Sequence, residues 1–204
     1  MRIVLVSWWR RARYRILTLD WYPPCLFIGF VAFWTWLAVA PRYRSDWLLE
    51  NMLVFTAIPV LAWVWYRGSV SRLAWSSIFL FLTFHEVGAH YTYSEVPYDQ
   101  WWQAIFGFSL DHELGFERNQ YDRCVHFLYG LLALPLVAEL MARLFCLDSL
   151  LLRLIPVSII MSHAALYELI EWFAAEVFGG ELDQAYLGVQ GIYGTHRRIC
   201  CWRF

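Results

Sequence analysis

The chain of 204 residues contains no lysine, and all sixteen of its basic residues are arginine. Without lysine it can form neither a lysine Schiff base nor a phosphate-binding loop that depends on a lysine. Charged residues are also scarce, at 16%, whereas a soluble domain carries about 25%. The net charge of −1 provides no basic field, so we expect no nucleic-acid partner.

Several common catalytic and metal-binding motifs are missing as well. No two of the five cysteines have C-x-x-C spacing, which excludes a zinc ribbon or a thioredoxin-like motif. No G-x-S-x-G occurs, which argues against serine hydrolases of that class. In HEVGAH, His85 and His90 are five residues apart, and on a helix they point about 140° apart. This spacing therefore argues against a zincin-type pair of ligands.

Apolar residues dominate what is present, at 60% of the chain, and the mean hydropathy is +0.45. A membrane-spanning helix needs roughly 20 mostly apolar residues. Five runs approach or exceed this length. Trp and Tyr lie at their ends, as expected where lipid meets water. The runs span residues 21–40, 47–65, 73–91, 122–144 and 152–178. The sequence therefore predicts an all-α, polytopic transmembrane helix bundle of about five spans, forming one domain over residues 1–191 within a lipid bilayer.

The distribution of arginine predicts the orientation. Arginine accumulates in connections on the cytoplasmic side of a membrane. Nine arginines fall on the side of the N-terminus, and four fall on the opposite side: Arg42, Arg44, Arg118 and Arg123. We therefore expect the N-terminus to be cytoplasmic and the long polar stretch at residues 92–121 to face outward.

Ionisable residues within the apolar runs are the candidate functional residues, because such groups are costly in lipid. Many are spaced by three, four or seven residues, which places them on shared helix faces. The predicted directions of the helices bring them to a similar depth near the outer side. This candidate polar pocket consists of Glu50, His85, Glu86, His90, Asp122, Arg123, His126, His163, Glu168 and Glu171. By contrast, Glu139 and Arg143 have the i, i+4 spacing of an ordinary helix ion pair.

Three interpretations of this pocket remain open. It could be a site for a divalent metal such as zinc, with His90, His126, Glu86 and Glu171 as ligands. It could be a proton or ion relay in a transporter, or polar groups that hydrogen-bond across helices and determine their packing. The corresponding functions are a small transporter or ion-coupled carrier with an outward-facing pocket, a membrane-embedded metal-dependent enzyme acting on a lipid or envelope precursor, and a structural membrane subunit. Catalytic residues and the oligomeric state do not follow from the sequence.

Four motifs in the order HEVGAHYTYSEVP, NQYDRCVHFLYG, YELIEW and YLGVQG resemble the YjdF-like family of bacterial inner-membrane proteins. The resemblance extends from about residue 21 to residue 191. It implies a multi-pass protein of the bacterial plasma membrane and transfers no catalytic residues. A weaker resemblance to VanZ-like membrane proteins is carried by Asp122, Arg123, His126 and Phe127.

The C-terminal segment departs from this family. After YLGVQG the family continues with an acidic stretch that contains tryptophan and then with another apolar helix. Here the segment IYGTHRRICCWRF shows no helical periodicity. We interpret residues 192–204 as the product of a frameshift that removed a sixth helix, and resequencing of the gene tests this interpretation.

Overall fold

The computed structural model describes residues 20–67, 70–145 and 150–178. The predicted frameshifted tail and the arginine-rich segment before residue 20 lie outside these residues. The secondary structure of the described part is helical, and it consists of α2 (Tyr22–Ala38), α3 (Arg44–Arg67), α4 (Arg72–Tyr91), α5 (Tyr98–Phe106), α6 (Leu110–Leu114), α7 (Tyr121–Leu144) and α8 (Leu151–Phe178). The predicted fold class is confirmed, and each of the five predicted runs forms a helix whose ends lie within three residues of the expected positions.

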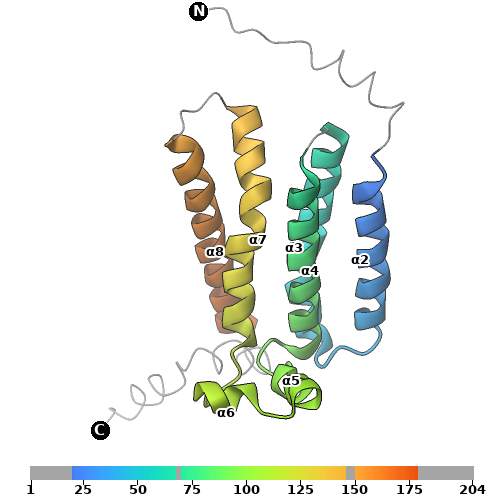
Figure 1. Ribbon diagram of the computed structural model, residues 1–204, viewed down its shortest axis with the longest axis vertical. Helices are drawn as coiled ribbons and strands as arrows, with labels where there is room; N and C mark the ends of the chain where they lie inside the picture. Colours follow the sequence, from blue (N-terminus) through green and yellow to red (C-terminus); the bar gives the residue numbers. More distant parts are fainter. Residues whose placement is uncertain (1–19, 68–69, 146–149, 179–204) are drawn as a thin grey trace, which may run out of the picture.

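The long helices α2, α3, α4, α7 and α8 lie side by side and alternate in direction (Figure 1). The start of α2, the α3–α4 connection and the α7–α8 connection share one end of the bundle, whereas α5 and α6 lie at the other end, called here the α5–α6 end. Arg67, Arg72, Arg143 and Arg153 all belong to the first end. Arg42, Arg44, Arg118 and Arg123 lie toward the α5–α6 end, so arginine is divided equally between the two ends among the described residues.

Helix α4 occupies the centre of the bundle. It packs against α2, α3 and α7, while α8 packs mainly against α7. Its buried side chains include Phe79, Phe81 and Leu82, and Phe79 meets Phe30 of α2 edge to face, with 6.0 Å between the ring centroids. A central helix buries residues on all sides, so α4 can shield polar groups that would be costly against lipid.

Length and composition identify three of the described helices as able to cross a membrane by themselves: α3, α7 and the segment Leu151–Ile170 of α8. Helix α2 is a shorter apolar helix. Helix α4 falls outside both groups because its second half carries His85, Glu86 and His90, yet it runs the length of the bundle beside the others (Figure 1). Large apolar side chains cover the outside of the bundle, for example Trp36, Phe127 and Met161. Such a surface belongs in a lipid bilayer.

Candidate functional site

The imidazole of His85 is held between two partners at the centre of the bundle. His85 is 2% exposed, and its Nε2 lies 3.2 Å from the backbone oxygen of Glu50 in α3. A carbonyl oxygen only accepts hydrogen bonds, so Nε2 carries the proton in this contact. On the other side of the ring, Nδ1 lies 2.5 Å from the hydroxyl of Tyr93, which donates to it when the imidazole is neutral.

Tyr93 reaches His85 because the chain reverses where α4 ends. Thr92 and Tyr93 both have positive φ, of 55° and 52°, and the Tyr93 N–H donates to the carbonyl oxygen of Gly88 at 2.8 Å. The ring of Tyr93 then lies directly over Gly88, where a Cβ would come within 2.5 Å of a ring carbon. Glycine is required at this position because any side chain would displace the tyrosine.

His126 in α7 lies between two carboxylates. Its Nε2 is 3.3 Å from Oδ1 of Asp122, one turn earlier in α7. Its Nδ1 is 3.4 Å from Oε1 of Glu168 in α8. An imidazole donates to two acceptors at once only when both of its nitrogens carry protons. The three side chains are half-buried, with about a third to a half of each exposed, and together they can bind or release a proton.

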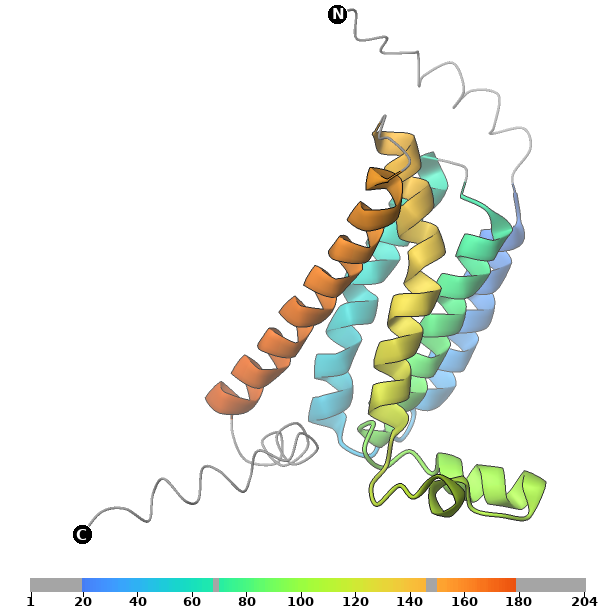
Figure 2. The same ribbon diagram turned by 60° about the vertical axis from the view of Figure 1, so that its left-hand side comes forward.

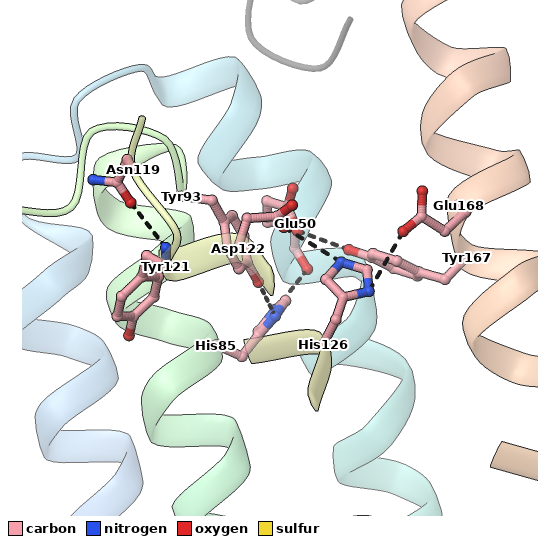
Figure 3. A network of polar contacts seen from close by, with 9 residues as sticks. All are labelled: Glu50, His85, Tyr93, Asn119, Tyr121, Asp122, His126, Tyr167 and Glu168. Carbon is pink, nitrogen blue, oxygen red and sulfur yellow. Dashed lines mark hydrogen bonds and ion pairs between the residues drawn. The ribbon is translucent and has the colours of Figure 1, made fainter. Parts of the chain in front are cut away.

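Two tyrosines connect α8 to the neighbouring helices. The hydroxyl of Tyr167 donates to Oε2 of Glu50 at 2.7 Å, and the hydroxyl of Tyr129 in α7 lies 2.8 Å from Nδ1 of His163. Figure 3 shows Glu50, His85, His126, Tyr167 and Glu168 converging from α3, α4, α7 and α8. The polar groups therefore form short chains of contacts that cross between helices.

A small cavity lies among these side chains. Its volume is about 40 Å³, which is enough for about two or three water molecules. Four helices contribute to its walls, which are formed by Leu53, Phe81, His85, Tyr93, Asp122, Val125, His126, Tyr129, His163, Ala164 and Tyr167. Asp122 belongs to the first turn of α7, so the cavity lies toward the α5–α6 end. Its size and its lining suit the binding and transfer of protons.

Comparison with known proteins then assigns the family. Residues 22–197 match the model of a family described as predicted membrane protein (DUF2238). The chain belongs to this family. A relative, the inner membrane protein YjdF of Escherichia coli (strain K12), is 32% identical over 154 residues, which cover 75% of this chain and 69% of the relative. No solved structure matches the chain.

These comparisons confirm the resemblance that the motifs indicated. The DUF2238 match contains every described helix, from α2 to α8, and therefore all of the polar residues around the cavity. It also ends six residues beyond the position where the family resemblance was expected to stop. Membership of the family, together with the apolar helices, establishes a multi-pass protein in a lipid bilayer.

The structure brings together six of the predicted pocket residues, at the cavity or in contact with its walls. They are Glu50, His85, Asp122, His126, His163 and Glu168. The tyrosines that complete the contacts were not among the predicted residues, although their spacing gives a signal. Tyr129 follows His126 by three residues and Tyr167 follows His163 by four, so each shares a helix face with a histidine.

Other predicted residues lie elsewhere. Glu86 is 0% exposed, and within the described part of the chain its two carboxylate oxygens have no hydrogen-bond partner. His90 places Nδ1 2.8 Å from the carbonyl oxygen of Leu37 at the end of α2. Arg123 is exposed and bonds to Oε1 of Gln120 at 3.3 Å. The side chain of Glu171 lies outside the described residues.

The predicted metal ligands are consequently not assembled as a set among the side chains that the structure describes. Glu86 and His90 do not line the cavity beside His126, and the two carboxylates that contact His126 approach different nitrogens of its ring. One metal ion cannot use both edges of an imidazole. In the described ranges, no group of three or more His, Cys, Asp or Glu residues is arranged to hold a metal ion.

Proposed function

We propose that this membrane protein is a small ion-coupled carrier and that its coupling ion is a proton held by Asp122, His126 and Glu168. The observation that carries the proposal is the position of His126 between carboxylates of two helices, at 3.3 Å and 3.4 Å, beside a cavity of water size. Ionisable groups at such a depth are costly in a membrane and typically mark pathways for ions or protons.

The two carboxylates belong to different helices, so binding of the proton is coupled to the position of one helix relative to the other. Asp122 shares α7 with His126, so their separation is set within one helix, whereas Glu168 approaches from α8. Movement of α8 relative to α7 changes the contact of His126 with Glu168 and leaves its contact with Asp122 in place. Protonation of the imidazole therefore favours the arrangement in which both helices are close, because two charge-assisted contacts form.

Burial and geometry favour this role over packing alone. Polar groups that only join helices are best satisfied by one direct bond in the interior. Here His126 remains about a third exposed, as does Asp122. A partly open site exchanges protons with water, which a proton-coupled carrier requires.

In the sequence, nine arginines fall on the side of the N-terminus and four on the opposite side, which supports an outward-facing cavity and a cytoplasmic N-terminus. The name of the E. coli relative supports a location in the bacterial inner membrane. Both assignments belong to the proposal.

The experiment is a proton-binding measurement on the full chain in proteoliposomes adsorbed to a solid-supported membrane. A sudden change of the external pH drives protons into the site and produces a transient current. We expect this current in the wild type and expect it to be lost in His126→Asn. Glu168→Gln should reduce it, because one of the two acceptors of the imidazolium no longer carries a charge.

The matched control is His112→Asn. His112 lies in α6, is 86% exposed and does not line the cavity. The same chemical change there should leave the current intact. A current of wild-type size in His126→Asn, or an equal loss in His112→Asn, overturns the proposal and leaves the structural interpretation of the polar cluster.

A further inference from the structure

A second surface of the molecule carries an unexplained apolar patch. Helices α5 and α6 lie beyond the end of the bundle, and α5 runs across the axis of the bundle (Figure 2). The exposed residues of this segment include Ile105, at 74%, and several other large apolar side chains, namely Trp101, Phe106, Phe108, Leu114 and Phe116. An exposed apolar patch of this kind marks a surface that something else covers.

The apolar side of α5 is continuous, and its polar side is opposite. Trp101 and Ile105 are four residues apart and therefore share one face. Next to them the ring of Phe106 lies 4.2 Å from that of Trp102, measured between centroids. Gln103 lies two residues before Ile105 and hence on the opposite face of the helix. Phe106 flanks this face on the side toward Gln103. We call Trp101 and Ile105 the α5 apolar face.

Hydrogen bonds of the first turn of α5 hold the helix in place. The hydroxyl of Tyr98 donates to Asp111 in α6 and accepts from the backbone N–H of Gln120, just before α7, at 3.1 Å. Asp99 accepts from the hydroxyl of Ser109 at 2.9 Å and from the N–H of Asp111 at 3.0 Å. The start of α5 is thus fixed, while Trp101 and Ile105 remain exposed.

We propose that the α5 apolar face inserts into the lipid bilayer at the boundary between headgroups and acyl chains, so that α5 is an interfacial helix. Helix α5 lies just beyond the level where the long helices end (Figure 2), and lipid already surrounds the apolar outside of the bundle. Trp and Phe are favoured at this depth. The helix is nine residues long, and it lies across the axis of the bundle and so along the membrane surface. Its acidic neighbours Asp99 and Asp111 remain on the side that bonds to α6 and α7.

Insertion of α5 fixes the position of the cavity relative to the membrane surface. Tyr98 bonds to the backbone of Gln120, and Asn119 Nδ2 donates to the carbonyl oxygen of Val96 at 2.8 Å. These contacts connect α5 and the residues before it to Asn119 and Gln120, which directly precede α7 and lie three and two residues before Asp122. The inference does not depend on the proposed function, since lipid contact of α5 holds for any activity.

The experiment uses a fluorescent probe at single positions of the full chain. The five native cysteines are replaced by serine, Ile105→Cys is labelled with an environment-sensitive dye, and the protein is reconstituted into liposomes of phosphatidylcholine and phosphatidylglycerol. We expect blue-shifted emission that is quenched by lipids carrying a spin label near the headgroup and is protected from iodide in the water. The control, Gln103→Cys, should show the reverse pattern.

Trp101→Cys provides a second attachment point on the same face, and it keeps the test decisive if the Ile105 variant does not fold. The liposomes contain no other protein, so a patch meant for a protein partner stays in contact with water. Equal quenching of the Ile105 and Trp101 probes by iodide, at the level of the Gln103 probe, overturns the proposal.

Discussion

The hydroxyl of Tyr167 in α8 donates a hydrogen bond of 2.7 Å to the carboxylate of Glu50 in α3, although the two residues are 117 positions apart in the chain. Glu50 is 2% exposed. Because α8 otherwise packs mainly against α7, this bond is a specific connection between α8 and the buried polar centre of the bundle.

Tyr167→Phe should lower the free energy of unfolding by about 1–3 kcal/mol, because the ring remains and only a donor to a buried carboxylate is removed. Thermal unfolding of the purified protein in lipid measures this change. Tyr66→Phe is the matched control, since Tyr66 is 79% exposed, and it should have no effect. Equal stability of the Tyr167 and Tyr66 variants would contradict the prediction.

Gly88→Ala should destabilise the protein by about 1–3 kcal/mol, because the new methyl group forces the ring of Tyr93 to move. The hydroxyl of the displaced Tyr93 also loses its hydrogen bond to Nδ1 of His85. The proton-binding current should therefore fall as well. Unfolding measurements and the current of the variant check both parts.

Gly130→Ala provides the comparison for this substitution. Gly130 lies within α7, and apart from its chain neighbours and the adjacent backbone of its own helix, no described atom lies within 4 Å of the position that its Cβ would take. Alanine there should leave stability unchanged or raise it by up to about 1 kcal/mol, because it restricts the unfolded chain. If both glycine variants lose stability to the same degree, the contact with Tyr93 is not the cause.

Glu139 in α7 binds the first turn of α4. Its carboxylate accepts from the backbone N–H of Ser71 at 2.7 Å and from the hydroxyl of Ser71, the N-cap of α4. Arg143 lies 3.6 Å away, which confirms the expected i, i+4 ion pair. Glu139→Ala should cost about 1–2 kcal/mol in unfolding measurements. Arg143→Ala should cost less, since a half-exposed ion pair contributes about 0–1 kcal/mol, and the opposite order would disprove this ranking.

The bond between α5 and α6 should depend on pH. The backbone N–H of Asp111 and the hydroxyl of Ser109 hold the pKa of Asp99 below its usual value. A lowered pKa in the folded state stabilises the fold at pH values above the unfolded pKa of about 3.9, and this stabilisation is lost as the pH falls through the folded value. Hydrogen exchange of the Asp111 amide should therefore be slower in the wild type than in Asp99→Asn near neutral pH, and the difference should disappear in acid. A difference that does not vary with pH would refute the assignment.

Burial raises the pKa of Tyr98 to about 12, with a further contribution from its hydrogen bond to Asp111. This sign is opposite to that of Asp99: the contribution is present below the unfolded pKa of about 10 and is lost as the pH rises toward the folded value. Both groups therefore retain the α5–α6 contacts across the physiological range.

Fusions of reporter enzymes should reveal the orientation of the bundle. Alkaline phosphatase, which is active only outside the cytoplasm, should be active when fused after Phe116 and inactive when fused after Phe145. The reason is the count of arginines in the sequence, where nine fall on the side of the N-terminus and of the α3–α4 and α7–α8 connections, and four fall on the opposite side. The reverse pattern of activity would place the N-terminus outside.

Much of the architecture was predictable because transfer into lipid is a property of local composition. The five apolar runs appear as α2, α3, α4, α7 and α8 with nearly the expected ends. The polar stretch between α4 and α7 was expected to be a loop, and the structure shows two short helices there. Helix α5 has only nine residues, and so short a helix is hard to distinguish from a loop by its pattern of apolar residues.

The sequence identified residues of the candidate site, but it predicted their arrangement only in part. The motif HEVGAH identifies adjacent ionisable residues, yet successive residues of a helix are rotated by about 100°. A helix that is apolar on most sides offers no polar stripe from which its rotation can be inferred. His85 faces the cavity, while the carboxylate of Glu86 is enclosed and His90 bonds toward α2.

The sequence by itself determined that the chain forms apolar helices in a membrane, where each begins and ends, and which ionisable groups lie within them. Only the tertiary structure decided that α4 is central, that Tyr93 folds back over Gly88 to His85, and that His126 lies between Asp122 and Glu168. The physical reason is that burial in lipid depends on the composition of each segment alone. Contacts between side chains depend on the rotation and packing of helices that are distant in the chain.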